Sequence, residues 1–299
     1  MKIISNQQIV DLGISPRECM EWIRESFCLK YEAQLPTKIS LHPQGTDFIN
    51  TMPCLLPERF NRFGVKVVSR IAGQKPSLHS DLLLYDSKSG ELLTLMEADW
   101  ITQMRTGAVA ALAIETLQKT NASVYSFIGL GSTAEATMAC LQATLPEDKQ
   151  YTIRIKRYKD HAERFAAGWS KENYNFVIVD TNEQLLENSD VLVSAVTEMP
   201  ELFCSDDSKY PEGILLVPIH TRGFQNCDLF FDHIYADDKG HVEGFKYFSQ
   251  FRAFSELSEV LLGRVAGRVN DKQRIIAYNI GLGLHDVLFA NKIYERLYR

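Results

Sequence analysis

A short glycine-containing segment carries the clearest chemical signal in this sequence. Residues 129–134 read Gly-Leu-Gly-Ser-Thr-Ala, which matches Gly-x-Gly-x-x-Ala, and they follow a predicted strand at residues 123–128. Gly129 permits a tight turn, Gly131 lets the backbone approach a pyrophosphate, and Ala134 lets strand and helix pack closely. Ser132 and Thr133 open the following helix, whose N-terminus would hold the phosphates. We interpret the segment as part of a dinucleotide site; an ordinary glycine turn is the alternative.

Two basic residues follow the next predicted strand, at residues 151–155. Lys156 and Arg157 stand at its end. Sites for NAD usually place Asp or Glu there to bind the ribose 2′-hydroxyl, whereas a basic residue suits the 2′-phosphate of NADP. The pair therefore slightly favours NADP over NAD, and a solvated surface cluster is the alternative.

The elements around these residues alternate between strand and helix. We expect strands at 123–128, 151–155, 176–179, 191–195, 214–217 and 234–236, with helices at 132–145, 161–169 and 183–187. This alternation indicates βαβ units and a Rossmann-type doubly wound parallel sheet, an α/β fold. Ala195 and Thr197 follow one of these strands, and we expect both at the cofactor.

The flanking regions have a different pattern. Residues 15–18 form a capping box that begins an amphipathic helix, and residues 38–95 predict a mostly antiparallel sheet. Residues 102–117 predict a buried helix. The tail predicts a strand at 274–278 and a helix at 283–297, which we expect to rejoin the N-terminal sheet. The sequence thus predicts an α+β domain at 1–118 and 264–299, with a Rossmann domain inserted at 119–263.

The composition argues against several other classes of protein. The net charge of −6, with both signs interspersed, disfavours nucleic-acid binding. No apolar run approaches the ~20 residues that span a bilayer, and no signal peptide is visible, so we expect a cytoplasmic protein. The six cysteines form no Cys-x-x-Cys pair and no His-Glu-x-x-His motif occurs, so we expect reduced thiols and no metal site.

Further segments occur in an order that points to a family. They are Asn50-Thr51-Met52-Pro53, Gly64-Val65-Lys66, Leu84-Tyr85-Asp86 with Gly90, Met104-Arg105-Thr106-Gly107-Ala108, the turn at 129–131, Glu256-Leu257-Ser258-Glu259 with Gly263, and the run from Asn279 to Asp286. The sequence resembles the ornithine cyclodeaminase/mu-crystallin family over nearly its whole length, most specifically at Arg-Thr-Gly-Ala. The resemblance implies a Rossmann domain inserted into a domain that binds substrate and forms a homodimer.

The resemblance also assigns roles to individual residues. It places Lys66 and Arg105 beside the reacting carbon, Lys66 to pair with a carboxylate or relay a proton and Arg105 to bind the carboxylate. Without it, Lys66 would be interpreted as a lysine extending from a strand to solvent, and Arg105 could pair with Glu97 or Asp99. Asp286 matches a family aspartate whose role, catalytic or structural, stays open. The remaining matches are Asn50 and Met52 at the substrate, and Thr106, Gly281 and Leu282 at the cofactor.

Three departures from the family pattern bear on the reaction. Lys38 stands where many relatives carry Arg near the substrate, and Asn50 stands where the cyclodeaminase uses Glu. After the strand at 214–217 the chain reads Pro-Ile-His-Thr-Arg, without the catalytic Asp of the cyclodeaminase. His220 could act there as acid or base, and Arg222 could bind a second acidic group. Ornithine cyclisation is therefore in doubt.

The leading hypothesis is an NAD(P)-dependent oxidoreductase acting on a small amino or imino acid, as a ketimine reductase, amino acid dehydrogenase or opine-type synthase. A cyclodeaminase-type ammonia-lyase that keeps NAD bound is the second hypothesis. The third is a non-catalytic protein that binds NADP and a small ligand, as in mu-crystallin. Net consumption of NADPH distinguishes the first hypothesis from the second, and cofactor binding without turnover marks the third.

Overall fold

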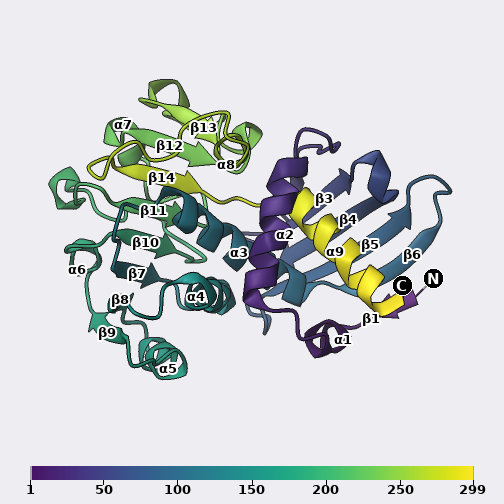
Figure 1. The fold of residues 1–299 in the computed structure, drawn as a ribbon, viewed down its shortest axis with the longest axis horizontal. Helices are drawn as coiled ribbons and strands as arrows, with labels where there is room; N and C mark the ends of the chain where they lie inside the picture. Colours follow the sequence, from purple (N-terminus) through teal and green to yellow (C-terminus); the bar gives the residue numbers. More distant parts are fainter. Residues whose placement is uncertain (1, 299) are drawn as a thin grey trace. The chain divides into compact units, whose positions relative to one another are not determined.

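The computed structural model describes residues 2–298, which fold into two compact units (Figure 1). The first unit comprises Met1–Arg105 with Gly281–Arg299, and the second comprises Thr106–Ile280. The second unit is therefore inserted into the chain of the first. The chain passes between the units at residues 105 and 280, whereas the sequence analysis set the divisions at 118 and 263.

A six-stranded sheet forms the first unit, in the order β1-β6-β5-β4-β3-β2. Strands β2 to β6 pair antiparallel and β1 pairs parallel with β6, which confirms the mostly antiparallel sheet expected here. The strands are β1 (Lys2–Ile4), β2 (Ile39–Leu41), β3 (Phe48–Leu55), β4 (Arg62–Arg70), β5 (Leu78–Asp86) and β6 (Leu92–Glu97).

Helices cover one face of this sheet. Helix α9 (Gly283–Tyr298) packs on β3, β4 and β5, and α2 (Pro16–Leu29) packs on α9; α1 (Asn6–Asp11) precedes α2. A Cβ at Gly64 would lie 2.8 Å from Val287, so glycine lets α9 approach β4 closely. Because side chains alternate along a strand, β4 turns Lys66 and Val68 toward α9 and Val65 and Val67 away from it.

The second unit contains an eight-stranded sheet, and every neighbouring pair of strands in it is parallel. The order is β13-β12-β14-β11-β10-β7-β8-β9, which reverses direction between β7 and β10 as in a doubly wound fold. The strands are β7 (Val124–Ile128), β8 (Tyr151–Lys156), β9 (Tyr174–Val179), β10 (Val191–Ser194), β11 (Leu215–Pro218), β12 (His233–Ala236), β13 (Phe254–Glu256) and β14 (Ile275–Tyr278).

The helices of the second unit connect these strands. They are α3 (Asp99–Leu117), which begins in the first unit, α4 (Ser132–Thr144), α5 (His161–Gly168), α6 (Asn182–Leu186), α7 (Cys227–Phe230) and α8 (Leu257–Leu261). Short 3-10 helices occur at η1 (Glu58–Phe60), η2 (Asp207–Lys209), η3 (Lys239–His241) and η4 (Phe248–Gln250).

The strand expected to rejoin the N-terminal sheet lies elsewhere. Strand β14 pairs with β11 and β12 in the parallel sheet, so that expectation is wrong. All four of its residues are buried. A strand buried on both faces is typical of a parallel sheet covered by helices, and only the helix after it belongs to the first unit.

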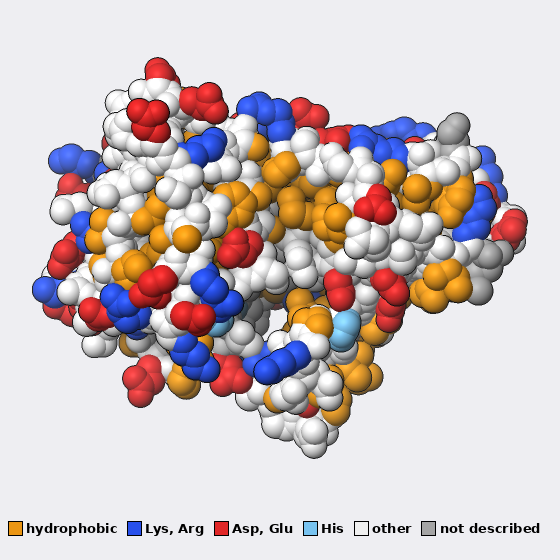
Figure 2. Space-filling model, turned by 90° about the horizontal axis from the view of Figure 1, so that it is seen from below, with side chains coloured by type: hydrophobic (Ala, Val, Ile, Leu, Met, Phe, Trp, Pro, Cys, Tyr) orange, Lys and Arg blue, Asp and Glu red, His pale blue; other side chains and the backbone are white. Residues whose placement is uncertain are grey.

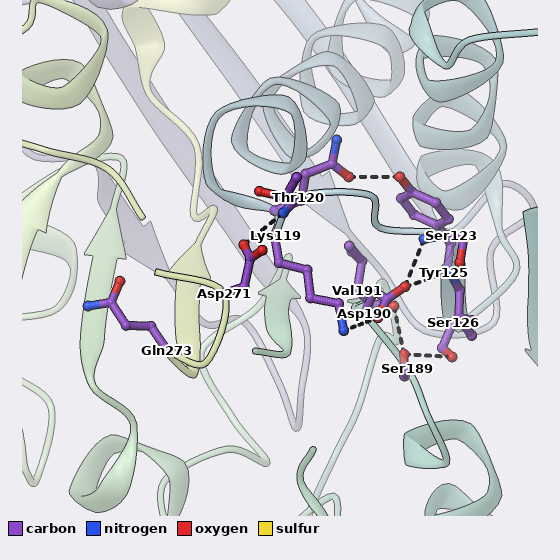
Figure 3. Close-up of polar contacts among 12 residues, drawn as sticks. Lys119, Thr120, Ser123, Tyr125, Ser126, Ser189, Asp190, Val191, Asp271 and Gln273 are labelled. Carbon is purple, nitrogen blue, oxygen red and sulfur yellow. Dashed lines mark hydrogen bonds and ion pairs between the residues drawn. The ribbon is translucent and has the colours of Figure 1, made fainter. Parts of the chain in front are cut away.

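A polar network fixes the start of the central strands of the parallel sheet (Figure 3). The carboxylate of Asp190, just before β10, accepts hydrogen bonds from the backbone N–H groups of Ser123 and Val124, at 2.7 and 2.9 Å. It also pairs with Nζ of Lys119 at 2.5 Å. The network holds β7 and β10 in register, and so aligns the loops that leave their carboxyl ends.

The surface carries charges of both signs. Figure 2 shows Lys and Arg side chains interspersed with Asp and Glu over the face that it draws. Within residues 2–298 no helix is both long and apolar enough to cross a membrane. Nor do the described His, Cys, Asp and Glu residues form a group that could hold a metal ion.

Candidate functional site

A buried cluster of charged side chains lies on the helix-covered face of the first sheet. Lys66 on β4 is 0% exposed, and its Nζ lies 2.6 Å from Oδ1 of Asp286 at the start of α9. Arg105 on α3 donates from Nε to the same oxygen at 3.0 Å. Two cations therefore share one carboxylate oxygen. Oδ2 of Asp286 is also buried, and it has no hydrogen-bond partner within residues 2–298.

Glycines allow this cluster to assemble. Gly281 has a φ of +98°, and a Cβ there would lie 2.5 Å from Nη1 of Arg105. Glycine is therefore needed both for this backbone conformation and to leave space for the guanidinium. A Cβ at Gly283 would lie 2.9 Å from the carbonyl oxygen of Met52 on β3. The segment before α9 thus brings Asp286 down onto the sheet beside Lys66.

The surroundings change the acidity of the lysine. Burial, and after it the neighbouring charge of Arg105, lowers the pKa of Lys66 from 10.5 to about 7. The charge and hydrogen bond of Asp286 oppose this shift, and Lys38 adds to it. Lys66 can therefore be either protonated or neutral close to neutral pH, which a solvated lysine cannot.

Two hydroxyls that the sequence analysis did not identify adjoin Lys66. Nζ of Lys66 donates to Oγ1 of Thr102 at 3.2 Å, and a hydrogen bond of 2.8 Å joins Thr102 to Oγ of Ser80. Thr102 precedes Arg105 by three residues in α3, so both lie on one helix face. The three-residue spacing in α3 could have placed Thr102 beside Arg105 from the sequence alone. It could not identify Lys66 and Ser80 as partners of Thr102, because these lie on β4 and β5.

Two predicted substrate residues lie on the same face of the sheet. Asn50 pairs with Val68 and Met52 with Lys66 across β3 and β4. Oδ1 of Asn50 is buried without a hydrogen-bond partner in the described part of the chain. Arg105 pairs with Asp286 and not with Glu97 or Asp99, the partners considered from the sequence alone.

The glycine turn of the second unit lines a pocket of about 460 Å³. The pocket lies at the carboxyl ends of β7 and β10, where the strand order reverses and such folds bind ligands. Its lining residues are Ile128, Gly129, Leu130, Gly131, Lys156, Arg157, Tyr158, His161, Ala195, Val196, Thr197 and Glu198.

The two glycines of the turn have different tasks. Gly129 has a φ of +81°, and a Cβ there would lie 2.5 Å from the backbone of Ala195, so the fold itself requires glycine. A Cβ at Gly131 would meet nothing within 4 Å. Gly131 is also the N-cap of α4 and supplies no side-chain cap, so a ligand can approach the first amides of the helix.

The basic pair lines this pocket but has protein partners. Nζ of Lys156 donates to Oδ1 of Asn182 at 2.5 Å. Arg157 donates from Nε to Asp180 at 2.9 Å and also pairs with Glu163. No acidic residue stands next to Arg157 in the sequence, whereas the fold brings Asp180 and Glu163 to it.

His220 lies at the end of β11 and is held by protein groups. A hydrogen bond of 2.7 Å joins its Nε2 to Oγ of Ser194, and its Nδ1 accepts from the backbone N–H of Arg222 at 3.4 Å. Burial lowers the pKa of His220 to about 4. The imidazole is therefore neutral at neutral pH, while the side chain of Arg222 is exposed.

The other predicted residues are placed as follows. Ser132, Thr133 and Ala134 form the first turn of α4, Thr106 lies in α3, Leu282 is buried just before α9, and Lys38 is half-buried before β2.

Relatives of known name match most of the chain. The chain is 28% identical to the nodulation efficiency protein NfeD of Rhizobium meliloti, over 87% of this chain and 83% of that protein. It is 26% identical to a Δ1-pyrroline-2-carboxylate reductase of Bacillus cereus, over 80% of this chain and 78% of that protein.

Solved structures share the fold. The Δ1-pyrroline-2-carboxylate reductase of Thermococcus litoralis, in complex with NADH and L-proline, has a TM-score of 0.86 at 24% identity, covering 99% of this chain and 97% of that one. An archaeal alanine dehydrogenase dimer with bound NAD has a TM-score of 0.83 at 22% identity, covering 98% and 94%.

A family model extends over most of the sequence. The model described as the ornithine cyclodeaminase/mu-crystallin family matches residues 2–214 of the 299. Lys66, Arg105 and the glycine turn all lie within the matched part. The glycine turn, the parallel sheet and this match lead to one conclusion: the protein belongs to the ornithine cyclodeaminase/mu-crystallin family.

Proposed function

We propose that the protein is an NAD(P)-dependent reductase or dehydrogenase that interconverts a small imino acid and the corresponding amino acid. The observation that carries this proposal is the buried Lys66, which shares Asp286 with Arg105 and has a pKa of about 7. Perturbed titratable groups that converge at one place are typical of active sites. Names of relatives, among them pyrroline-2-carboxylate reductase and alanine dehydrogenase, support the substrate class.

The pocket at the glycine turn fits a dinucleotide. The open space at Gly131 leaves room for the pyrophosphate against the first turn of α4, with the amides of Ser132 and Thr133 as donors. When bound, the nicotinamide supplies or accepts the hydride. Lys156 and Arg157 would bind the adenosine ribose, and their charges favour the 2′-phosphate of NADP, although Asp180 and Glu163 partly neutralise Arg157.

Arg105 and Lys66 would divide the work on the substrate. Nε of Arg105 is used by Asp286, which leaves the Nη groups to bind the substrate carboxylate. Lys66 would give a proton to the imino nitrogen during reduction, or take one from the amine during oxidation, at Nζ. Asp286 holds both cations in place, and Lys38 adds positive charge for an anionic substrate.

The competing functions have less support. A cyclodeaminase needs a carboxylate after β11, where this chain has His220, which is neutral and held by Ser194. A protein that only binds ligands has no need of a buried lysine that changes its charge near neutral pH, since burying an ammonium group costs stability. Both observations favour net redox chemistry.

Substitutions of the cluster test the proposal. Lys66→Met should lower the turnover of Δ1-pyrroline-2-carboxylate, or of pyruvate with ammonia, by about 10²-fold or more while NADPH still binds. Arg105→Lys should also fail, because an ammonium cannot replace a guanidinium that serves Asp286 and a carboxylate together. Lys88→Met, an exposed lysine of the same unit, is the control. Near-normal rates for Lys66→Met would refute the proposed site.

The pH dependence follows from the pKa of Lys66. Reduction needs protonated Lys66, so its rate should fall as the pH rises through about 7. Oxidation needs neutral Lys66, so its rate should rise over the same range. Steady-state rates measured in both directions from pH 5 to 10 check this. A profile in which both directions rise together across neutral pH would contradict the role of Lys66.

The cofactor assignment has its own test. Titration by nicotinamide fluorescence should show tighter binding of NADPH than of NADH, and Arg157→Ala should abolish that preference. Gly131→Ala should weaken the binding of both NADPH and NADH. It should not lower the melting temperature, because a Cβ at this position meets nothing within 4 Å in the free protein. Equal affinities in the native protein would refute the NADP preference.

We also propose a homodimer formed through the face of the first sheet that lies away from α9. Its apolar side chains, Phe63, Val65, Leu83 and Tyr85, are only half-buried, and Val67 is 36% exposed. A contiguous exposed apolar surface of this kind usually marks an interface. Light scattering should give about twice the chain mass of 34.0 kDa, and Val67→Glu should reduce it toward that mass. A native monomer would contradict the proposal.

A further inference from the structure

The proposed function requires Lys66 to gain and lose a proton in every turnover, yet the side chain is 0% exposed. Some path must therefore connect Nζ with solvent. The groups that face Lys66 differ in whether they can carry a proton. The guanidinium group of Arg105 offers donors but no acceptor for a proton, and Asp286 is itself 0% exposed. Within residues 2–298, Nζ of Lys66 bonds to Asp286 and Thr102 and not to the thiol of Cys54, so Cys54 does not continue the path. Lys38 acts on Lys66 through its charge.

Two hydroxyls remain, and they form a chain. Nζ of Lys66 lies 3.2 Å from Oγ1 of Thr102, which lies 2.8 Å from Oγ of Ser80. A hydroxyl can accept one proton while it donates another, and either atom of the Ser80–Thr102 bond can be the donor. The hydrogen bond between the two hydroxyls can therefore be donated toward Lys66 or away from it without any movement of a heavy atom.

The two hydroxyl-bearing residues have slightly more exposed surface than Lys66 has. Ser80 is 4% exposed, and its backbone N–H donates to Asp99 at 2.7 Å. The other oxygen of Asp99 pairs with His79, whose side chain is 61% exposed. Thr102 is 6% exposed, so both hydroxyl-bearing residues have a little exposed surface, whereas Lys66 and Asp286 have none.

We propose that Thr102 and Ser80 form the path by which protons move between Lys66 and solvent. After Lys66 has given its proton to the substrate nitrogen, the protons along the path shift together, and Nζ takes the hydroxyl proton of Thr102. Thr102 takes the proton of Ser80, and Ser80 takes one from a hydronium ion or buffer acid in the adjoining solvent. Both hydroxyls are restored, and the net result is one proton moved inward. Oxidation of an amino acid runs the same steps outward. The use of this path in turnover rests on the proposed function, whereas its existence does not.

The direct test measures proton exchange at Lys66 without any substrate. In protein labelled with ¹⁵N-lysine, NMR gives the exchange rate of the Nζ protons with water at pH 6. Thr102→Val, which keeps the shape of the side chain and removes its hydroxyl, should slow this exchange about 10²-fold or more, the usual effect of losing a positioned acid–base group. Thr102→Ser should retain a rate close to that of the native protein. Thr94→Val is the matched control, because Thr94 is also buried in this sheet and its hydroxyl donates to the carbonyl of Leu95, not to Lys66, within residues 2–298.

Ser80→Ala provides a second variant in case Thr102→Val does not fold, and it should slow exchange in the same way. Turnover of Δ1-pyrroline-2-carboxylate should show a lower kcat and an unchanged KM in Thr102→Val, with rescue in Thr102→Ser. Unchanged exchange in both Thr102→Val and Ser80→Ala would overturn the path whatever the activity. Slowed exchange would support it even if the native protein turned over neither probe, a result that would count against the proposed function alone.

Discussion

The first unit is arranged around one carboxylate oxygen that two cations share. Removing Lys66, Arg105 and Asp286 from water carries a desolvation cost of several kcal/mol per ion, and pairing offsets it only where the geometry is good. The surrounding elements supply that geometry. Strand β4 is an inner strand of the sheet, and Asp286 lies in the first turn of α9, where the helix dipole favours a negative charge. Glycines at 281 and 283 let that turn approach Arg105 and β3. A buried ion cluster is weak evidence for stability, so a chemical role is the better explanation of its presence.

In the inserted unit, the two glycines of the turn at residues 129–131 differ in what surrounds them. Gly129 is needed by the fold, since its backbone conformation and the nearby Ala195 exclude a side chain, whereas a Cβ at Gly131 would meet nothing within 4 Å. The Arg-Thr-Gly-Ala segment shows a similar division. Arg105 binds Asp286, and a Cβ at Gly107 would lie 2.5 Å from the backbone of Ala136 in α4. One helical turn thus serves the charged cluster with its first residue and helix packing with its third, which explains why these residue types stand together.

Much of this could be predicted from the sequence because the signals are local. The alternation of strands and helices, the glycine turn and the apolar centre of α3 each follow from residues close together in the chain. Membership of Lys66 and Arg105 in one site came from the family resemblance, and the structure brings them together on Asp286. The shared carboxylate could not be derived, since Lys66 and Asp286 are 220 residues apart. The same holds for the two acids beside Arg157 and for Ser194 beside His220. Strand β14 was assigned to the wrong sheet because a short apolar run does not reveal which neighbours it pairs with.

We expect Lys66 to change its protonation state near neutral pH because it is buried beside Arg105 and Asp286. The most direct measurement is an NMR titration of the Lys66 side chain, followed through its ¹³Cε shift in the native protein and assigned with Lys66→Met. We expect a midpoint at about 7, and a lower one in Asp286→Asn, which removes the charge that favours the ammonium. A midpoint close to the ordinary 10.5 would contradict the account, since Lys66 would then remain charged throughout the working range.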